Sequence, residues 1–392
     1  MRASYLPSLF ALLSTAAAQD FATPSWIDLT TEVQGRYWFT DSPTPHLMKF
    51  NDGNDFSPRL QLRLDVRPSD QWYLHATVRY DDGFDADDQP DGAVRLDQVF
   101  ARWSPGGTGK VNLQVGKFAT VFGNHIPNHE FQDNPFLTDP LPYSEINGVA
   151  VRNPAGNTPT AIANRAPGRI FTTPKINWAA QIWGPAYTSG ASIFGQVDKL
   201  QYAFEVKNVE TGAHSPQWDP SFSDFEDPSF AGRIAWQHDA SLTFGLSFAR
   251  GPYLNPEVNT VDRGDFQHTM VGLDARYALG AWILSGEIIH SIYDIPGSDD
   301  LASFNYYLQA RYKAAPGLWL AARFGQTINN NIATPSGEEV EWSPDLWRAE
   351  GAVGYRITPD LLLKGQYTFT HTSGRFIGPG EQALGMGVGW RF

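Results

Sequence analysis

The chain has 392 residues, 14% aromatic residues, no cysteine and a formal net charge of −13. This acidic balance argues against nucleic acid as a partner, because a nucleic-acid-binding surface needs clustered positive charge. The mean hydropathy of −0.34 and the lack of any run near about 18 apolar residues exclude a helical membrane protein. Membrane barrels escape both criteria, because every second strand residue faces the lumen.

The N-terminus has the three parts of a secretory signal peptide. Met1 and Arg2 form a positive start, residues 6–13 are an apolar stretch, and three alanines at 16–18 precede Gln19. The apolar stretch is too short to span a membrane. We therefore predict a signal peptide over 1–18 and a mature chain over 19–392. The lack of cysteine agrees with export through an oxidising periplasm.

Alternation of apolar and polar residues, which indicates β-strands, recurs along the whole mature chain. An early example sets Leu60, Leu62 and Leu64 opposite Arg59 and Arg63. The predicted strands cover 26–39, 58–67, 72–81, 93–103, 110–122, 186–195, 199–207, 229–237, 241–250, 267–278, 281–291, 303–313, 318–326, 346–357, 361–370 and 382–392. The alternation slips near 97–98, as a β-bulge would allow.

The last predicted strand ends on Phe392, with apolar residues at alternate positions before it. A terminal strand needs a neighbour, and in outer-membrane barrels the last strand pairs with the first and removes both edges. This ending resembles the signal that the outer-membrane assembly machinery recognises, so we expect that machinery as a partner. The alternative is an ordinary last strand of a soluble β-protein.

Together these patterns predict an all-β, transmembrane antiparallel β-barrel of about 16 strands in the outer membrane of a Gram-negative-type bacterium. Short turns alternate with longer loops, which predicts periplasmic turns, extracellular loops and periplasmic termini. Aromatic residues lie near strand ends on the apolar face, as in the girdles that contact lipid and lipopolysaccharide. A soluble sandwich explains the alternation, but not the even pairing, the girdles, the signal peptide and the terminal Phe together.

The inward-facing positions are rich in arginine, which predicts a lumen that favours anions. The predicted pore-lining arginines are Arg36, Arg59, Arg63, Arg79, Arg95, Arg233 and Arg323. The alternative is that they pair with lumen carboxylates and line a wide, wet pore. The acidic excess is assigned to loops, of which the second carries Asp81, Asp82, Asp85, Asp87, Asp88 and Asp91. No metal site or cofactor is expected.

A long segment, 123–175, follows the fifth predicted strand and carries Glu130, Asp133 and Asp139 among apolar residues. If it folds into the barrel, its carboxylates face the arginines of the wall and create a transverse field at a constriction. If it does not, it forms a lid on the rim of the barrel.

Several stretches resemble the phosphate-selective porin O/P family. They are 115–123 (VGKFATVFG), 199–208 (KLQYAFEVKN), 250–254 (RGPYL) and 272–277 (GLDARY) with 286–287. The resemblance implies a 16-stranded channel that is usually trimeric, so a homotrimer is expected. The chain departs from the phosphate-selective members in having only eight lysines and acidic loops, which puts phosphate selectivity in doubt.

The function that these features favour is passive diffusion of small hydrophilic solutes, with a weak preference for anions. One alternative is a structural or envelope-tethering barrel with a plugged lumen. The other is a hydrolase in the barrel wall, for which His290 with Ser285 and Ser291 would be the candidates. The alternation turns His290 toward lipid, and no acyl-transfer motif surrounds it, so an enzyme is not expected.

Overall fold

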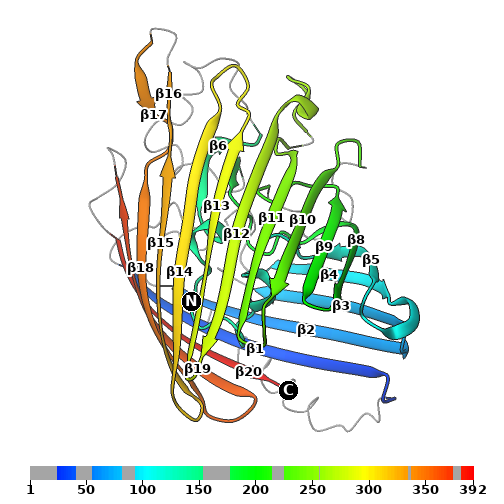
Figure 1. The fold of residues 1–392 in the computed structure, drawn as a ribbon. Helices are drawn as coiled ribbons and strands as arrows, with labels where there is room; N and C mark the ends of the chain where they lie inside the picture. The colour runs from blue at the N-terminus through cyan, green and yellow to red at the C-terminus, as the bar shows by residue number, and fades with distance from the viewer. Residues whose placement is uncertain are drawn as a thin grey trace.

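The computed structural model describes residues 24–40, 55–81, 93–152, 177–213, 225–255, 257–333, 337–373 and 381–392. They form one closed antiparallel barrel of sixteen strands, which confirms the predicted fold class (Figure 1). Among the described residues no helix is long and apolar enough to cross a membrane. The predicted signal peptide, the second-loop aspartates after Asp81 and residues 153–175 lie outside the described part.

All sixteen predicted strands are present, with bounds that differ by a few residues. In barrel order they are β1 (Ile27–Thr40), β2 (Asp55–Ser69), β3 (Trp72–Asp81), β4 (Ala93–Trp103), β5 (Asn112–Phe118), β8 (Thr188–Val197), β9 (Leu200–Lys207), β10 (Ser229–Gln237), β11 (Leu242–Pro252), β12 (Gln267–Leu279), β13 (Trp282–Tyr293), β14 (Leu301–Ala315), β15 (Leu318–Asn329), β18 (Leu346–Arg356), β19 (Leu361–Thr372) and β20 (Glu381–Arg391).

Two small sheets that are not part of the barrel wall have no counterpart in the sequence pattern. One pairs β6 (Ile146–Ala150) with β7 (Trp178–Ala180). The other pairs β16 (Asn331–Ala333) with β17 (Glu339–Glu341), and Figure 1 shows it beyond the end of β15. These strands have only three to five residues, which is too short for a period-two pattern to stand out.

The barrel closes where β1 pairs with β20, from Glu32 opposite Arg391 to Thr40 opposite Ala383. Phe392 continues this ladder, because its N–H donates to the Thr31 carbonyl at 2.9 Å and its carbonyl accepts from the Thr31 N–H at 2.7 Å. Closure leaves no unpaired edge in the barrel sheet. Both ends of the described chain lie at the end of the barrel that carries the short turns, which we call the turn side; the opposite end is the loop side.

Strand residues that point outward are mostly apolar, and those that point into the lumen are mostly polar or small, as the end of β20 illustrates. Leu384, Met386 and Trp390 are about half exposed on the outer face, at 48%, 51% and 46%. The glycines between them face inward, where a Cβ added at Gly389 would lie 2.5 Å from the Phe131 ring. Only glycine therefore fits where the inner loop packs against this strand.

Two departures from regular pairing shape the first half of the wall. The register between β3 and β4 shifts at Thr77 and Val78, where Asp97 is the extra residue of β4, so the predicted bulge is confirmed. β5 ends at Phe118, four residues before the predicted end, after Gly116 adopts φ +134°. From Phe118 the chain leaves the wall and enters the lumen.

Deletion of Phe392 should lower the fraction of folded barrel. The deletion removes two backbone hydrogen bonds at the closing seam and the terminal aromatic residue that resembles the assembly signal. We expect less heat-modifiable protein on a semi-native gel and unchanged secretion to the periplasm. Insertion equal to that of the unaltered chain would show that assembly does not depend on this residue.

Candidate pore lumen

The segment from Phe118 to Ala150 lies inside the barrel and contacts the wall on opposite sides. Its hydrogen bonds reach β9 at Glu205, β13 at Glu287, β19 at Gln366 and β2 at Gln61. A segment that bonds to strands around most of the circumference can only lie within the lumen. We call residues 119–150 the inner loop.

Three buried cations of the wall hold the centre of the inner loop by its backbone carbonyls. The Arg36 guanidinium donates to Leu137 O at 2.9 Å. Arg323 donates to the carbonyls of Thr138 at 3.0 Å and Asp139 at 3.2 Å. The Lys364 ammonium donates to the carbonyls of Phe131, Asn134 and Phe136. Arg36 and Arg323, predicted to line the pore, therefore lie beneath the inner loop.

Apolar contacts reinforce this attachment. Phe131, Phe136 and Leu137 form a buried cluster with the inward-facing Trp38 and Trp319 of the wall. The Arg323 and Lys364 cations each lie 4.2 Å from an aromatic ring centroid, those of Phe136 and Phe131 respectively. Cations stacked on aromatic faces gain favourable electrostatic energy, so the anchoring residues stabilise both the loop backbone and its side chains.

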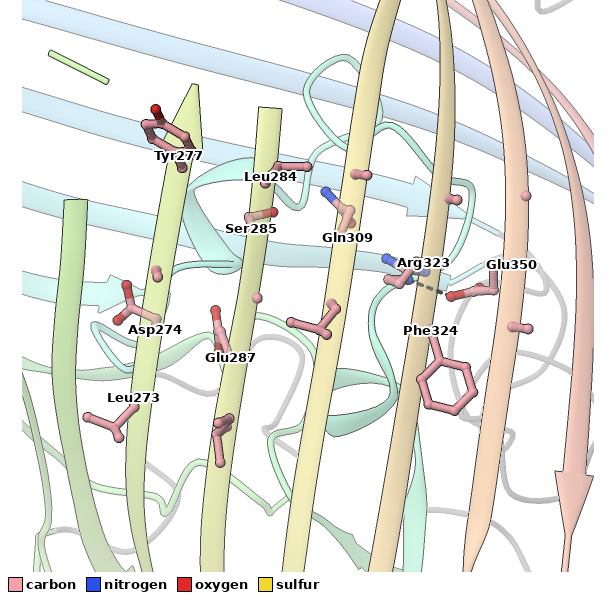
Figure 2. Close-up of a pocket in the computed structure, with 18 of the residues that line it drawn as sticks. Leu273, Asp274, Tyr277, Leu284, Ser285, Glu287, Gln309, Arg323, Phe324 and Glu350 are labelled. Carbon is pink, nitrogen blue, oxygen red and sulfur yellow. Dashed lines mark hydrogen bonds and ion pairs between the residues drawn. The ribbon is translucent and has the colours of Figure 1, made fainter. Parts of the chain in front are cut away.

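The first part of the inner loop is held by carboxylates. Glu205 accepts from the Thr120 hydroxyl at 2.7 Å, and Glu287 accepts from the Asn124 N–H and the Tyr143 hydroxyl at 2.7 and 2.5 Å. Figure 2 shows Glu287 beside Asp274 on the neighbouring strand, with a dashed line between Arg323 and Glu350. On this side of the barrel, the charged side chains of the wall therefore bond to the inner loop or pair with one another.

On the opposite side, three predicted pore-lining arginines surround one carboxylate. Asp81 is 2% exposed and lies 3.3 Å from Arg59, 3.0 Å from Arg79 and 3.3 Å from Arg95. Asp97, the bulge residue, lies 3.1 Å from Arg79. Asp81 was predicted to belong to the exposed acidic loop, and that assignment is wrong: it ends β3 and faces the lumen.

The inner loop meets this arginine cluster at Glu130. Its carboxylate is 3.5 Å from Arg63 and 3.4 Å from the Gln61 amide. The neighbouring His129 shares a hydrogen bond of 2.8 Å with the Tyr187 hydroxyl. Burial raises the pKa of Glu130, but the charges of His129, Arg63 and Arg59 outweigh it and lower the pKa to about 2. Glu130 is therefore ionised at neutral pH.

We call Arg59, Arg63, Arg79, Arg95, Asp81, Asp97 and Glu130 the charged ring. It contains four guanidinium groups and three carboxylates, which leaves one net positive charge. The arrangement has features of both expectations. Glu130 of the inner loop faces Arg63 of the wall, as a transverse field would require. Asp81 and Asp97 of the wall pair with arginines, as in the alternative.

The remaining predicted pore residues lie elsewhere. Arg233 makes a two-point contact with Asp274 at 2.7 and 2.8 Å. Asp139 is buried and bonds to His125 at 3.0 Å, inside the inner loop. Asp133 is exposed and interacts electrostatically with Arg311, away from the charged ring. Of the three loop carboxylates, only Glu130 faces the arginines of β2.

A pocket of about 500 Å³, lined by both polar and apolar residues, remains beside the inner loop; we call it the turn-side pocket. It is lined by β4, β5, β8, β9 and β10 together with residues 119–127, and it extends toward the turn side. Arg102 lines it and was not among the predicted pore residues. Beyond the bulge at Asp97 the inward positions of β4 are Phe100 and Arg102, so counting back from the outward Trp103 would have found it.

The outer face of β12 to β19 carries an apolar groove of about 870 Å³, shown in Figure 2. Its lining includes the small residues Ala275, Gly286, Ala310, Ala322 and Gly351, and the half-exposed side chains of Leu273, Leu308 and Tyr367. This groove belongs to the belt that faces lipid.

The inner loop also contains a carboxyl group that should make its packing depend on pH. Glu145 is 5% exposed and accepts from Thr327 at 3.0 Å, and burial raises its pKa to about 8. Because the packed loop retains this proton while a released loop would lose it near pH 4.5, packing weakens as pH rises from about 4.5 to 8. We expect proteolysis of the loop to increase as pH rises from about 5 to about 8 and to level off above that.

Replacement of Glu145 by Gln should abolish this increase, because the amide keeps the shape but cannot ionise. The exposed Glu339 of β17, changed to Gln, is the matched control and should leave the pH dependence as it was. A pH profile that is unchanged in Glu145→Gln would assign the effect to another group.

No family model matches the chain, and no curated protein matches its sequence. Solved structures match its fold. OmpT, an outer membrane protein of Vibrio cholerae, has a TM-score of 0.57 at 10% identity, covering 93% of this chain and 97% of its own. An anion-selective porin from Comamonas acidovorans has 0.56 at 11%, covering 93% and 99%. The outer membrane channel DcaP of Acinetobacter baumannii has 0.58 at 11%, covering 93% and 97%.

These similarities, at about one residue in ten, show the fold: the chain has a barrel of the outer-membrane type. The closed wall, the apolar outer belt and the polar interior agree with that assignment. The resemblance to the phosphate-selective O/P family stays a prediction.

Proposed function

We propose that the protein is an outer-membrane porin through which small hydrophilic solutes diffuse passively. The observation that carries this proposal is the arrangement of the lumen. The inner loop contacts the wall at β2, β9, β13 and β19, while the turn-side pocket stays open beside β4, β5 and β8. Wall side chains alone cannot fill a sixteen-stranded barrel, so we infer that the space beside the inner loop belongs to a passage.

The proposed passage prefers anions weakly. The charged ring has one net positive charge, and the turn-side pocket adds Arg102, which has no carboxylate partner among the described residues. Low-dielectric walls strengthen the field of these groups, whereas carboxylates in the predicted external loops would be screened by bulk salt within about 8–10 Å. The Comamonas porin with the same fold is described as anion-selective, which supports this assignment by analogy.

Single-channel recording tests the proposal. The purified barrel, added to a planar bilayer, should give discrete conductance steps. Under a potassium chloride gradient, the sign of the reversal potential should show that chloride is more permeant than potassium. A barrel that inserts without conducting would contradict the porin function. A cation-selective step would contradict only the preference.

A structural barrel with a plugged lumen is the second candidate, and one observation favours it. The inner loop buries Phe122, Tyr143 and Ile146 completely, which is the packing of a core rather than of a mobile lid. Two results would support this function: a barrel that inserts into the bilayer without conducting, and an envelope that is weaker in cells from which the protein has been deleted.

The hydrolase candidate gains nothing from the structure. His290 is exposed on the outer face, while the neighbouring Ser291 is fully buried on the inner face and donates to Gln181. The two side chains lie on opposite faces of β13, so they do not form a nucleophile and base pair.

The homotrimer and the contacts with lipid, lipopolysaccharide and the assembly machinery remain part of the proposal. The mass of the detergent-solubilised protein, measured by light scattering with the detergent subtracted, tests the trimer. A monomer would remove this part and leave the channel function intact.

A further inference from the structure

The turn-side pocket contains a cation held in one orientation. Arg102 donates from Nε at 3.2 Å and from Nη2 at 3.0 Å to the Gln114 side-chain oxygen. Its guanidinium carbon lies 4.9 Å from the ring centroid of Phe194, 5.1 Å from Tyr73 and 5.5 Å from Phe100. Three rings and one amide thus fix the group without neutralising it.

The other cations of the lumen differ from Arg102. Arg233, at the far side of the same pocket, is paired with Asp274, and the arginines of the charged ring share Asp81 and Asp97. Arg102 forms no ion pair within the described ranges, and its remaining N–H groups are not used by the contacts above. A guanidinium in this state is a ready two-point donor for a carboxylate or another oxyanion.

The pocket also offers an apolar face. Phe118 and Phe194 line it, and its volume of about 500 Å³ is within the range of small-molecule sites. Gln196 and Gln201 at its turn-side end can bond to polar substituents. The pocket therefore combines one oriented cation with aromatic surface and neutral polar groups.

We propose that this pocket is a binding site for small organic carboxylates that carry a flat apolar group. The carboxylate bonds to Arg102, and the apolar part lies against Phe194. This inference rests on the proposed channel function and names the solute class that the passage would concentrate. Binding should be weak, with a dissociation constant on the order of 1 mM, because a permeating solute must also leave.

Calorimetric titration of the detergent-solubilised barrel with sodium benzoate tests the site. Benzyl alcohol is the neutral analogue and should bind at least about tenfold more weakly, because it cannot pair with the guanidinium. Inorganic phosphate, an oxyanion without an apolar group, should also bind more weakly than benzoate. Equal affinity for benzoate and benzyl alcohol, or a preference for phosphate, would overturn the proposed solute class.

One variant and its control locate the site. Arg102→Gln should weaken benzoate binding by about tenfold or more. Arg276→Gln removes an inward-facing arginine of β12 outside the pocket and should leave the affinity within about twofold. Heat-modifiable migration shows which variants fold, and if Arg102→Gln does not, the comparison of benzoate with benzyl alcohol and phosphate still decides.

The result separates this inference from the channel function. Normal conductance with no benzoate binding, or with binding unchanged in Arg102→Gln, overturns the site and leaves the porin. Benzoate binding that depends on Arg102 in a barrel that does not conduct supports the site and contradicts the porin.

Discussion

Replacing Arg59, Arg63 and Arg79 by serine should turn the passage from weakly anion-preferring to cation-selective. The change leaves Arg95 with Asp81, Asp97 and Glu130, so the charged ring goes from one net positive to two net negative charges. A unit charge about 8 Å away at an effective dielectric constant of about 20 shifts an ion's energy by about 2 kcal/mol before salt screening. The potassium-to-chloride permeability ratio should therefore rise by at least about tenfold.

The reversal potential under a potassium chloride gradient measures this effect. Asp81→Asn is the opposite change, and it should increase the anion preference because it removes the carboxylate that three arginines share. Replacing Asp85, Asp87, Asp88 and Asp91 of the second loop by Asn is the control, and bulk salt should make its effect far smaller. Equal shifts from the ring and the second loop would show that the external loops control selectivity.

Replacing Arg36, Arg323 and Lys364 by methionine should release the inner loop and raise the single-channel conductance several-fold. These side chains supply donors to six backbone carbonyls of residues 131–139. Each carbonyl left buried without a donor costs about 1–3 kcal/mol. Their sum exceeds the roughly 5.5 kcal/mol that moves a two-state equilibrium from almost fully packed to almost fully released.

Single-channel conductance in concentrated salt, where selectivity matters least, measures the release, and faster proteolysis of the loop should accompany it. Arg391→Met is the matched control, because Arg391 also faces the lumen but bonds to Glu32 of β1 and not to the inner loop. A folded triple variant with unchanged conductance would show that the aromatic contacts of Phe131 and Phe136 suffice, or that the loop does not limit the flow.

The sequence by itself predicted the sixteen wall strands, their inward and outward faces and the closure through Phe392. It could do so because period two is a local property: each residue of a strand shows its side through its immediate neighbours. The bulge at Asp97 was visible for the same reason, as a slip in that period. The inward direction of Arg59, Arg63 and Arg79 followed from the alternation, without any knowledge of their partners.

Only the tertiary structure decided which charges are neutralised and where the long segment lies. Arg36 bonds to a carbonyl 101 residues away and Lys364 to one 233 residues away, and no local pattern encodes such pairs. Asp81 lies at the boundary between strand and loop. A shift of one residue there determines whether its carboxylate faces bulk water or contacts three arginines. Arg102 was missed because the bulge inverts the alternation before it. Strand identity follows from short-range periodicity, whereas the electrostatics of the lumen follow from contacts that exist only after the barrel has closed around its inner loop.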